Sequence, residues 1–157
     1  MTQIKYDLEN SFGSIVRRTD IALINRLNQN FKKAGYDITT EQYRVLVNLW
    51  NKDGQNQQEI AEATRKNKTS MTRILNRLEK RNLVVRVPNH LDNRNKLIYL
   101  TNKGKKIPEA LANLAKQTLS ETLVGISEKK IEMCKDILCE IFDNLYSLSV
   151  NDGTEEN

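Results

Sequence analysis

The stretch TSMTRILNRLEKRNLVVRVPNHLDNRNKLIYLTNKGK, residues 69–105, changes its hydrophobic period halfway along, and this change decides the fold. Its first part carries apolar residues at three- and four-residue steps: Met71, Ile74, Leu75 and Leu78. They fall within about 100° of helical arc, which predicts an amphipathic helix over 68–81. The second part holds two short β-rich runs, LVVRVP and LIYLT, on either side of the polar segment 89–96, and this pattern predicts a β-hairpin.

Helical periodicity continues on both sides of this stretch, so the chain is predicted to be mainly α with a small β-hairpin. Thr39 or Thr40 is placed to cap the second helix, and Thr101 is placed to cap the helix after the hairpin. The expected apolar-patterned helices cover 8–31, 40–52, 55–63, 111–126 and 131–148. A short helix, a second helix and then a hairpin make a winged helix-turn-helix, with the hairpin as its wing.

Charge is unevenly distributed along the chain. The whole sequence carries a formal charge of +5, yet residues 55–106 hold thirteen Lys or Arg and only four Asp or Glu. A basic middle between acidic ends favours a polyanionic partner, and the alternative is a solvated surface that happens to be basic. The winged helix-turn-helix pattern decides for double-stranded DNA.

The outer face of the helix over 68–81 has the side chains that suit a major groove. Arginine bonds bidentately to guanine and asparagine to adenine, while hydroxyl groups and lysines hold phosphates. An ordinary solubilising surface is the alternative for this helix taken alone. The candidate DNA-binding residues on this recognition helix are Lys68, Thr69, Ser70, Thr72, Arg73, Asn76, Arg77 and Lys80.

The polar segment 89–96 is predicted to be the tip of the wing. Arg94 suits the negative potential of a narrow minor groove, and Asp92 stands where it can pair with the guanidinium and orient it. The candidate DNA-binding residues of the wing are Asp92, Arg94, Asn95 and Lys96. His90 has no second His and no Cys at ligand spacing, so no metal site is expected.

Other classes of function find no support in the sequence. It has no Ser-His-Asp set, no glycine-rich phosphate loop and no H-E-x-x-H motif, so we expect neither catalysis nor a cofactor. No run of eighteen apolar residues predicts a membrane span, and the N-terminus lacks the apolar core of a signal peptide. Two cysteines make no disulfide framework, which indicates a cytoplasmic protein with reduced thiols. Cys134 and Cys139 are expected to be buried small apolar residues.

The segment EIAEATRKNKTSMTRILNRLEKRNLVVRVPNHLDNRNKLIYLTNKGKK, residues 59–106, resembles the core of MarR-type winged-helix transcriptional regulators. The matching pieces are TSMTRILNRLEKRNLV, the D-x-R-x-K pattern of DNRNK, and LTNKGK; the resemblance extends over roughly 5–148. The segment departs from the family in two places. Its usual Gly and apolar residue in the turn are replaced within TRKN by charged residues, and its usual Gly after the recognition helix is Asn82, which tolerates a left-handed conformation.

The resemblance implies a homodimer in which terminal helices form the interface and two lobes grip a pseudo-palindromic operator. It implies a single domain over 1–150, with a winged-helix lobe over about 38–104 and dimerisation helices over about 5–34 and 105–149. We expect residues 151–157 to be a disordered tail. Family members usually repress promoters and release DNA when a small phenolic or other ligand binds.

Such an effector, a small aromatic or phenolic molecule, would lie between the lobe and the dimerisation helices. The expected pocket residues share helical spacing within two helices: Phe12, Ile15, Tyr43, Val47 and Trp50. Plain core packing of the same side chains is the alternative. Two other functions also stay open, namely a DNA-binding architectural or anti-repressor protein without an effector, and a winged helix that binds proteins.

Overall fold

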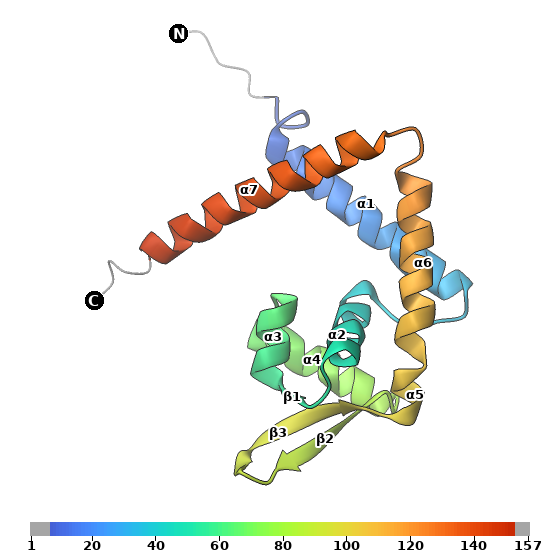
Figure 1. Cartoon of the computed structure of the whole chain (residues 1–157), viewed down its shortest axis with the longest axis vertical. Helices are drawn as coiled ribbons and strands as arrows, with labels where there is room; N and C mark the ends of the chain where they lie inside the picture. The colour runs from blue at the N-terminus through green and yellow to red at the C-terminus, as the bar shows by residue number, and fades with distance from the viewer. Residues whose placement is uncertain (1–6, 153–157) are drawn as a thin grey trace. The chain divides into compact units, whose positions relative to one another are not determined.

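The computed structural model describes residues 7–152, apart from the side chains at 93, 151 and 152. It divides the chain into two compact units, Met1–Thr122 and Leu123–Asn157, where the sequence predicted one domain over 1–150. The first unit contains α1 (Phe12–Lys33), α2 (Thr40–Asn51), β1 (Gln55–Asn56), α3 (Gln57–Thr64), α4 (Lys68–Lys80), β2 (Val84–Asn89), β3 (Asp92–Leu100), α5 (Asn102–Lys105) and α6 (Ile107–Thr122) (Figure 1). The second contains α7 (Glu128–Asp152). The predicted class, mainly α with a small β wing, is confirmed.

The helices begin where short polar side chains cap them. Ser11 accepts a hydrogen bond from the backbone of the first turn, so α1 begins after Ser11 and four residues later than the apolar spacing had predicted. Thr39 caps α2 and forms a complete capping box with Gln42. Asn56 does the same for α3 with Glu59, which moves the start of that helix to Gln57. Capping therefore sets the boundaries that apolar periodicity left open.

A three-stranded antiparallel sheet in the order β1-β3-β2 carries the wing. Arg86 of β2 lies opposite Ile98 of β3, and Gln55 of β1 lies opposite Ile98 on the other edge. The strand β1 was not predicted, because its residues were expected to open a helix. The buried Gln55 side chain donates a hydrogen bond to the Asn48 side chain at 2.9 Å, which holds this segment extended against β3.

The wing is longer and its turn is tighter than the polar loop over 89–96 predicted. Strand β3 already begins at Asp92, so the turn consists of His90 and Leu91, with a register shift at Pro88/Asn89. The Asn89 side chain accepts a hydrogen bond from the backbone N–H of Leu91 at 3.1 Å. Asparagine favours such turns, and here it shortens the loop to two residues.

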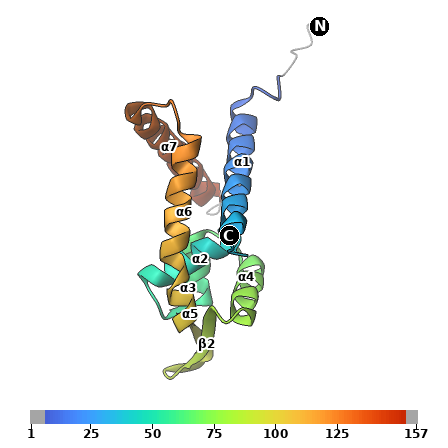
Figure 2. The same cartoon turned by 90° about the vertical axis from the view of Figure 1, so that its right-hand side faces the viewer.

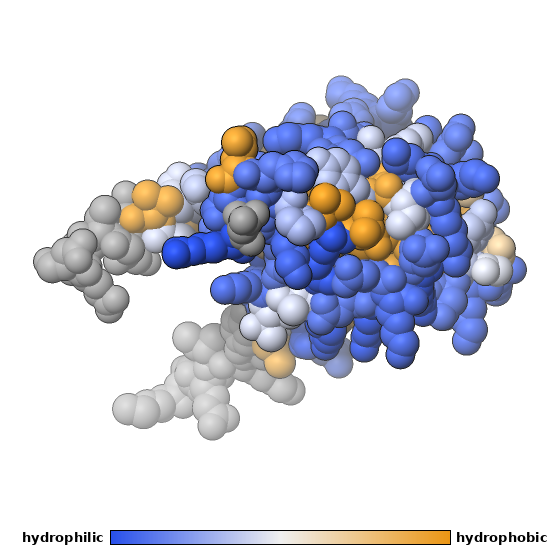
Figure 3. Space-filling model, turned by 90° about the horizontal axis from the view of Figure 1, so that it is seen from below, coloured by the Kyte–Doolittle hydropathy of each residue, from blue (hydrophilic) through white to orange (hydrophobic). Residues whose placement is uncertain are grey.

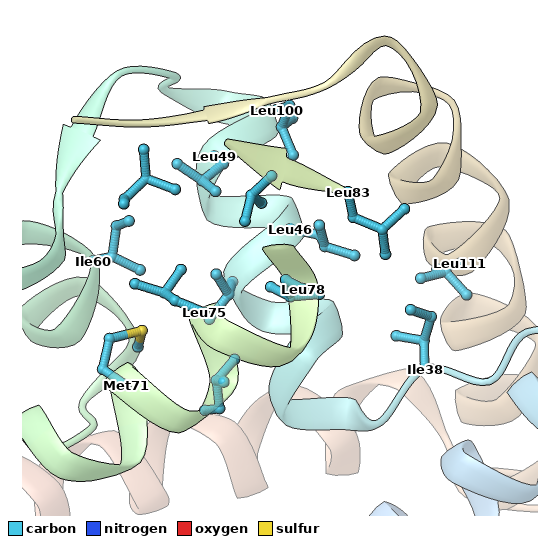
Figure 4. Packing of buried hydrophobic residues seen from close by; sticks show 14 of the residues in the cluster. Ile38, Leu46, Leu49, Ile60, Met71, Leu75, Leu78, Leu83, Leu100 and Leu111 are labelled. Carbon is cyan, nitrogen blue, oxygen red and sulfur yellow. The ribbon is translucent and has the colours of Figure 1, made fainter. Parts of the chain in front are cut away.

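The hydrophobic core lies among α2, α3, α4, the sheet and α6. Figure 4 shows side chains from these elements pointing toward one another. Its fully buried members include Leu46, Leu49, Ile60, Met71, Leu75, Leu78, Ile98 and Leu111. The predicted apolar stripe of α4 is therefore part of this core, and the opposite side of α4 faces outward.

Helix α6 lies beside the C-terminal half of α1 (Figures 1 and 2), where polar bonds join the two helices. The Asn30 side chain donates to the Thr118 hydroxyl at 2.8 Å, and Arg26 forms an ion pair with Glu121 at 2.9 Å. The hydrogen bond from Arg26 lowers the pKa of the Glu121 carboxyl. Within the described residues, no helix is long and apolar enough to cross a membrane.

The described part of the second unit contains one long helix, α7. Its large apolar side chains are exposed in the isolated chain: Met133, Ile137, Leu138, Phe142, Leu145, Tyr146, Leu148 and Val150. Cys134 and Cys139 are exposed too, so their predicted burial is wrong for a single chain, whose described core cluster takes no residue from α7. The predicted tail also begins too early, because α7 continues to Asp152, and 153–157 lie outside the described residues.

Gly104 in the LTNKGK motif stands against the backbone that leads into β2. A Cβ atom at this position would lie 2.0 Å from the carbonyl oxygen of Leu83. Thr101 caps the short helix α5 by accepting from the Gly104 N–H at 3.0 Å, so the same turn is fixed from both sides. Only glycine permits this approach, which connects the end of the wing to α6.

Replacing Gly104 with Ala should therefore lower the free energy of unfolding by about 1–3 kcal/mol, the usual cost of overpacking. Gly13→Ala is the matched control, because a Cβ there meets nothing within 4 Å. Its stability should equal that of the original chain or exceed it by less than about 1 kcal/mol. Denaturant unfolding followed by circular dichroism at one protein concentration measures both, and equal stabilities of the two variants would contradict the argument.

Candidate nucleic-acid interface

The turn between α3 and α4 positions the helix that was predicted to recognise DNA. Arg65 takes a left-handed conformation with φ of 54°, in the segment where glycine was the expected residue. Asn67 then caps α4 by accepting from the Ser70 N–H at 2.8 Å. Across the turn, the Gln57 side chain donates to the Thr72 hydroxyl at 2.6 Å. These bonds fix α4 against α3.

The outward side of α4 is a continuous polar surface that lines a hollow of about 570 Å³. Seven of the eight residues predicted for the recognition helix lie along it: Lys68, Thr69, Thr72, Arg73, Asn76, Arg77 and Lys80. Ser70 is the exception, being half-buried and lining neither this hollow nor the one toward the wing. It precedes the buried Ile74 by four residues, which puts it at the edge of the apolar stripe.

Thr72 has less hydrogen-bonding capacity than its exposure indicates. Its hydroxyl donates to the Lys68 carbonyl at 2.9 Å and accepts from the Gln57 side chain. A hydroxyl has one hydrogen to donate, so Thr72 cannot donate to a phosphate or a base without breaking its bond to Lys68. Its methyl group and the second acceptor lone pair of its hydroxyl remain for contact with DNA.

On the wing, Asp92 bonds to neighbouring residues of the wing, whereas the Arg94 guanidinium is open to a partner. Asp92 accepts from the backbone N–H of Arg94 and from the side chain of Asn95, each at 3.0 Å. The predicted pairing of Asp92 with the guanidinium of Arg94 is therefore wrong, and Asp92 instead holds the backbone of the wing. Within 7–152, no ion pair or hydrogen bond of the Arg94 guanidinium is found, so it is open to a partner.

A second hollow, of about 700 Å³, joins the start of α4 to the wing. Its wall contains Gln57 and Glu62 of α3, Thr72 of α4, and Asn95 and Ile98 of β3. Six Lys or Arg side chains share it with Glu62, its one acidic residue: Arg65, Lys66, Lys68, Arg86, Arg94 and Lys96. Figure 3, seen from the end with the wing, shows a mostly hydrophilic face with small apolar patches. A basic hollow between a helix and a hairpin suits a sugar-phosphate backbone.

Two of these six cations are already neutralised within the chain. Lys66 forms an ion pair with Glu41, and this hydrogen bond lowers the pKa of the Glu41 carboxyl despite partial burial. Arg86 forms an ion pair with Glu79. On the described part of the chain, several cations of the two hollows have no ion-pair partner: Lys68, Arg73, Arg77, Lys80, Arg94 and Lys96.

Two of the five residues predicted for the effector pocket line a hollow in the single chain. Tyr43 and Val47 line a hollow of about 400 Å³ between α2 and α3, and the other three do not. Tyr43 packs edge-on against Phe31, with ring centroids 5.4 Å apart, and burial raises the pKa of the Tyr43 hydroxyl. Phe12 precedes Phe31 by nineteen residues on the same helix, which is about 28 Å of rise.

Comparison with known proteins relates the chain to one family. Residues 38–96 match the model of the MarR family. SarZ, an HTH-type transcriptional regulator of Staphylococcus aureus, is 31% identical over 113 residues, which are 69% of this chain and 75% of SarZ. YybA, an uncharacterised HTH-type regulator of Bacillus subtilis, is 26% identical over 139 residues, which are 88% of this chain and 89% of YybA.

Solved structures agree with this assignment. MepR of S. aureus, in a complex with DNA, superposes with a TM-score of 0.78 at 26% identity, covering 85% of this chain and 98% of MepR. PcaV of Streptomyces coelicolor, in complex with its natural ligand, gives a TM-score of 0.79 at 22% identity, covering 88% of this chain and 96% of PcaV. At that identity the likeness to PcaV establishes the fold alone.

The open guanidinium at the wing generates a prediction. Arg94→Ala should weaken binding to a specific DNA site by roughly 1–3 kcal/mol, about 5–150-fold, the range for losing a groove contact. The variant should melt at the same temperature, because Arg94 makes no ion pair in the described chain that the change would break.

Lys116→Ala on α6 is the control, since it removes an exposed positive charge outside both hollows. Fluorescence anisotropy with labelled DNA at about 0.15 M salt compares the variants. Equal affinities of Arg94→Ala and the original chain would show that Arg94 does not contact DNA.

Proposed function

The chain belongs to the MarR family of winged-helix transcriptional regulators, and on this premise we propose that it binds a pseudo-palindromic operator as a homodimer and represses transcription. In the proposed complex α4 enters the major groove, and the wing reaches the adjacent minor groove through Arg94. The residues proposed to contact DNA are the seven outward side chains of α4 and, on the wing, Arg94, Asn95 and Lys96.

The observation that carries this proposal is the continuity of the basic surface. The hollow along α4 and the hollow toward the wing share Lys68 and Thr72, so the helix and the hairpin border one path. Such a path lets the phosphate backbone run beside α4 while base edges face its outer side chains. MepR, 26% identical to this chain, has been crystallised with DNA, which supports the same use of the fold here.

Exposed apolar side chains support the homodimer. The eight large apolar residues of α7 named above are exposed, and the N-terminal half of α1 exposes Phe12 at 58% and Ile21 at 45%. A soluble monomer rarely exposes so many large apolar side chains, because covering their surface is favourable by roughly 25 cal/mol per Å². A two-fold dimer covers the same surface on both copies and presents two recognition helices about one DNA turn apart.

Release by a small molecule is the regulatory part of the proposal. The effector would have to bind the DNA-free arrangement of the dimer better than the DNA-bound one, with a coupling of about 1–3 kcal/mol. The hollow beside Tyr43 and Val47 is the starting point for such a site. PcaV holds a natural ligand in the same fold, although its identity to this chain supports only the fold.

Selection of bound sequences from a random DNA pool tests the proposed function. We expect an inverted repeat whose half-sites lie about 10–10.5 base pairs apart, and an affinity that falls steeply with salt. The recovered operator is then titrated with a panel of aromatic acids while Trp50, the only tryptophan and half-exposed, reports binding by its fluorescence.

In that experiment, a different result would contradict each part of the proposal. Recovery of no sequence, together with weak salt dependence, would favour a protein-binding winged helix. A specific operator without any ligand that releases it would leave a DNA-binding protein without an effector. An unpaired half-site would contradict the homodimer.

Introducing charge into the apolar stripe of α7 tests the dimer directly. Leu138→Glu with Leu145→Glu should give a monomer or an aggregate that no longer binds the operator, because neither carboxylate tolerates burial in an interface. Lys129→Glu, on the opposite face of α7, changes the net charge by the same amount and should leave the dimer intact. Sedimentation velocity measures the assembly, and a DNA-competent monomer would refute the proposal.

A further inference from the structure

Arg86 connects the wing to the recognition helix through one side chain of that helix. From the middle of β2, its guanidinium donates to the Asn76 side-chain oxygen Oδ1 at 2.9 Å and to the carboxylate of Glu79. Only 16% of the Arg86 side chain is exposed, whereas Asn76 stands on the outer face of α4. A largely buried cation therefore holds one end of an exposed amide.

The chemistry of the two groups fixes how this amide is turned. A guanidinium has hydrogen-bond donors and no acceptor, so the atom of Asn76 that faces it has to be the carbonyl oxygen. The amide nitrogen Nδ2 consequently points away from Arg86. Glu79 accepts a second N–H of the same guanidinium, which keeps Arg86 in place.

The orientation limits which bases Asn76 recognises. The bidentate asparagine–adenine contact needs Oδ1 to accept from adenine N6 while Nδ2 donates to N7. In this chain one lone pair of Oδ1 accepts from Arg86, so the oxygen end of the amide is held toward the wing and only its second lone pair is left for adenine N6. Nδ2 remains free to donate to N7 or O6 of a purine or to O4 of thymine, but a cytosine edge offers it only another donor.

We propose that Arg86 is a specificity-determining positioning residue, which turns Asn76 into a hydrogen-bond donor toward the operator. This inference rests on the proposed binding of a specific operator and adds to it the chemical preference at one position in each half-site. At that position, adenine, guanine and thymine edges are accepted and a cytosine edge is rejected. The free energy of a wrong base at a good contact corresponds to about a 5–150-fold loss of affinity.

The main test removes the guanidinium without changing the net charge. Glu79→Gln with Arg86→Met deletes both members of the ion pair, so the attraction to phosphates is preserved. Random-pool selection should then lose the discrimination against cytosine at the Asn76 position, because the freed amide can turn over and present Oδ1 to the cytosine N4 amino group. Other positions of the operator should keep their preferences.

A mutant cycle that combines the double variant with Asn76→Ala distinguishes positioning of Asn76 by Arg86 from a purely structural role of Arg86. Asn76→Ala alone should remove the base preference at one position per half-site, and in that background the double variant should change nothing further at this position. A purely structural role of Arg86 would instead lower affinity for all sequences alike, and would do so whether or not Asn76 is present. Arg86→Lys, which keeps the charge but lacks the planar fork, replaces the double variant if that chain fails to fold.

Three outcomes overturn the inference, and they can be told apart. An unchanged base profile in both Arg86 variants shows that Arg86 does not orient Asn76. A uniform loss of affinity in Asn76→Ala shows a phosphate contact instead of base recognition. If the original chain selects no sequence, the proposed function fails first and the inference falls with it.

Discussion

Burial of the apolar stripe of α4 determines which side chains of this helix face outward. Met71, Leu75 and Leu78 of α4 are fully buried between α2, α3 and the sheet, and this burial sets the rotation of the helix about its axis. Once the stripe is inside, the arginines, asparagine and lysines of the same helix have to point outward. The wing follows directly from the end of α4, because the left-handed Asn82 reverses the chain into β2. The basic surface is thus a consequence of the core.

Much of this could be predicted from the sequence, for physical reasons. The 3.6-residue period of α4 and the β-rich runs of the hairpin are local signals, and burial of one face enforces them. The strand β1 has only two residues, too few for an apolar period, so no sequence pattern predicts it. It is held by a hydrogen bond of the Gln55 side chain. The tight turn of the wing depends in the same way on single hydrogen bonds of Asn89 and Asp92. The effector pocket stays a prediction, because a matching apolar face on each of two helices does not say which of their residues lie side by side.

The candidate interface also shows why a list of polar residues overstates the chemistry available to a ligand. Thr72 donates its hydrogen to Lys68, Asp92 accepts from the wing backbone, and one lone pair of the Asn76 oxygen accepts from Arg86. Residue types and spacing predict which side chains form this surface, but the internal bonds decide which donors and acceptors face outward. The open cations at Arg73, Arg77 and Arg94 keep their full capacity, so they and the constrained polar groups contribute differently to affinity and to selectivity.

Arg65 places stability and affinity in opposition at a single position. A residue other than glycine in the left-handed region costs about 1 kcal/mol or more. Arg65 has this conformation, and its side chain lines the basic hollow. Glycine would relieve the backbone but would remove a positive charge from the path proposed for the phosphates. Relief of the backbone therefore favours glycine at 65, while DNA binding and the interaction that Arg65 makes within the chain favour arginine. The turn between α3 and α4 is consequently a place where backbone relief and DNA binding favour different residues.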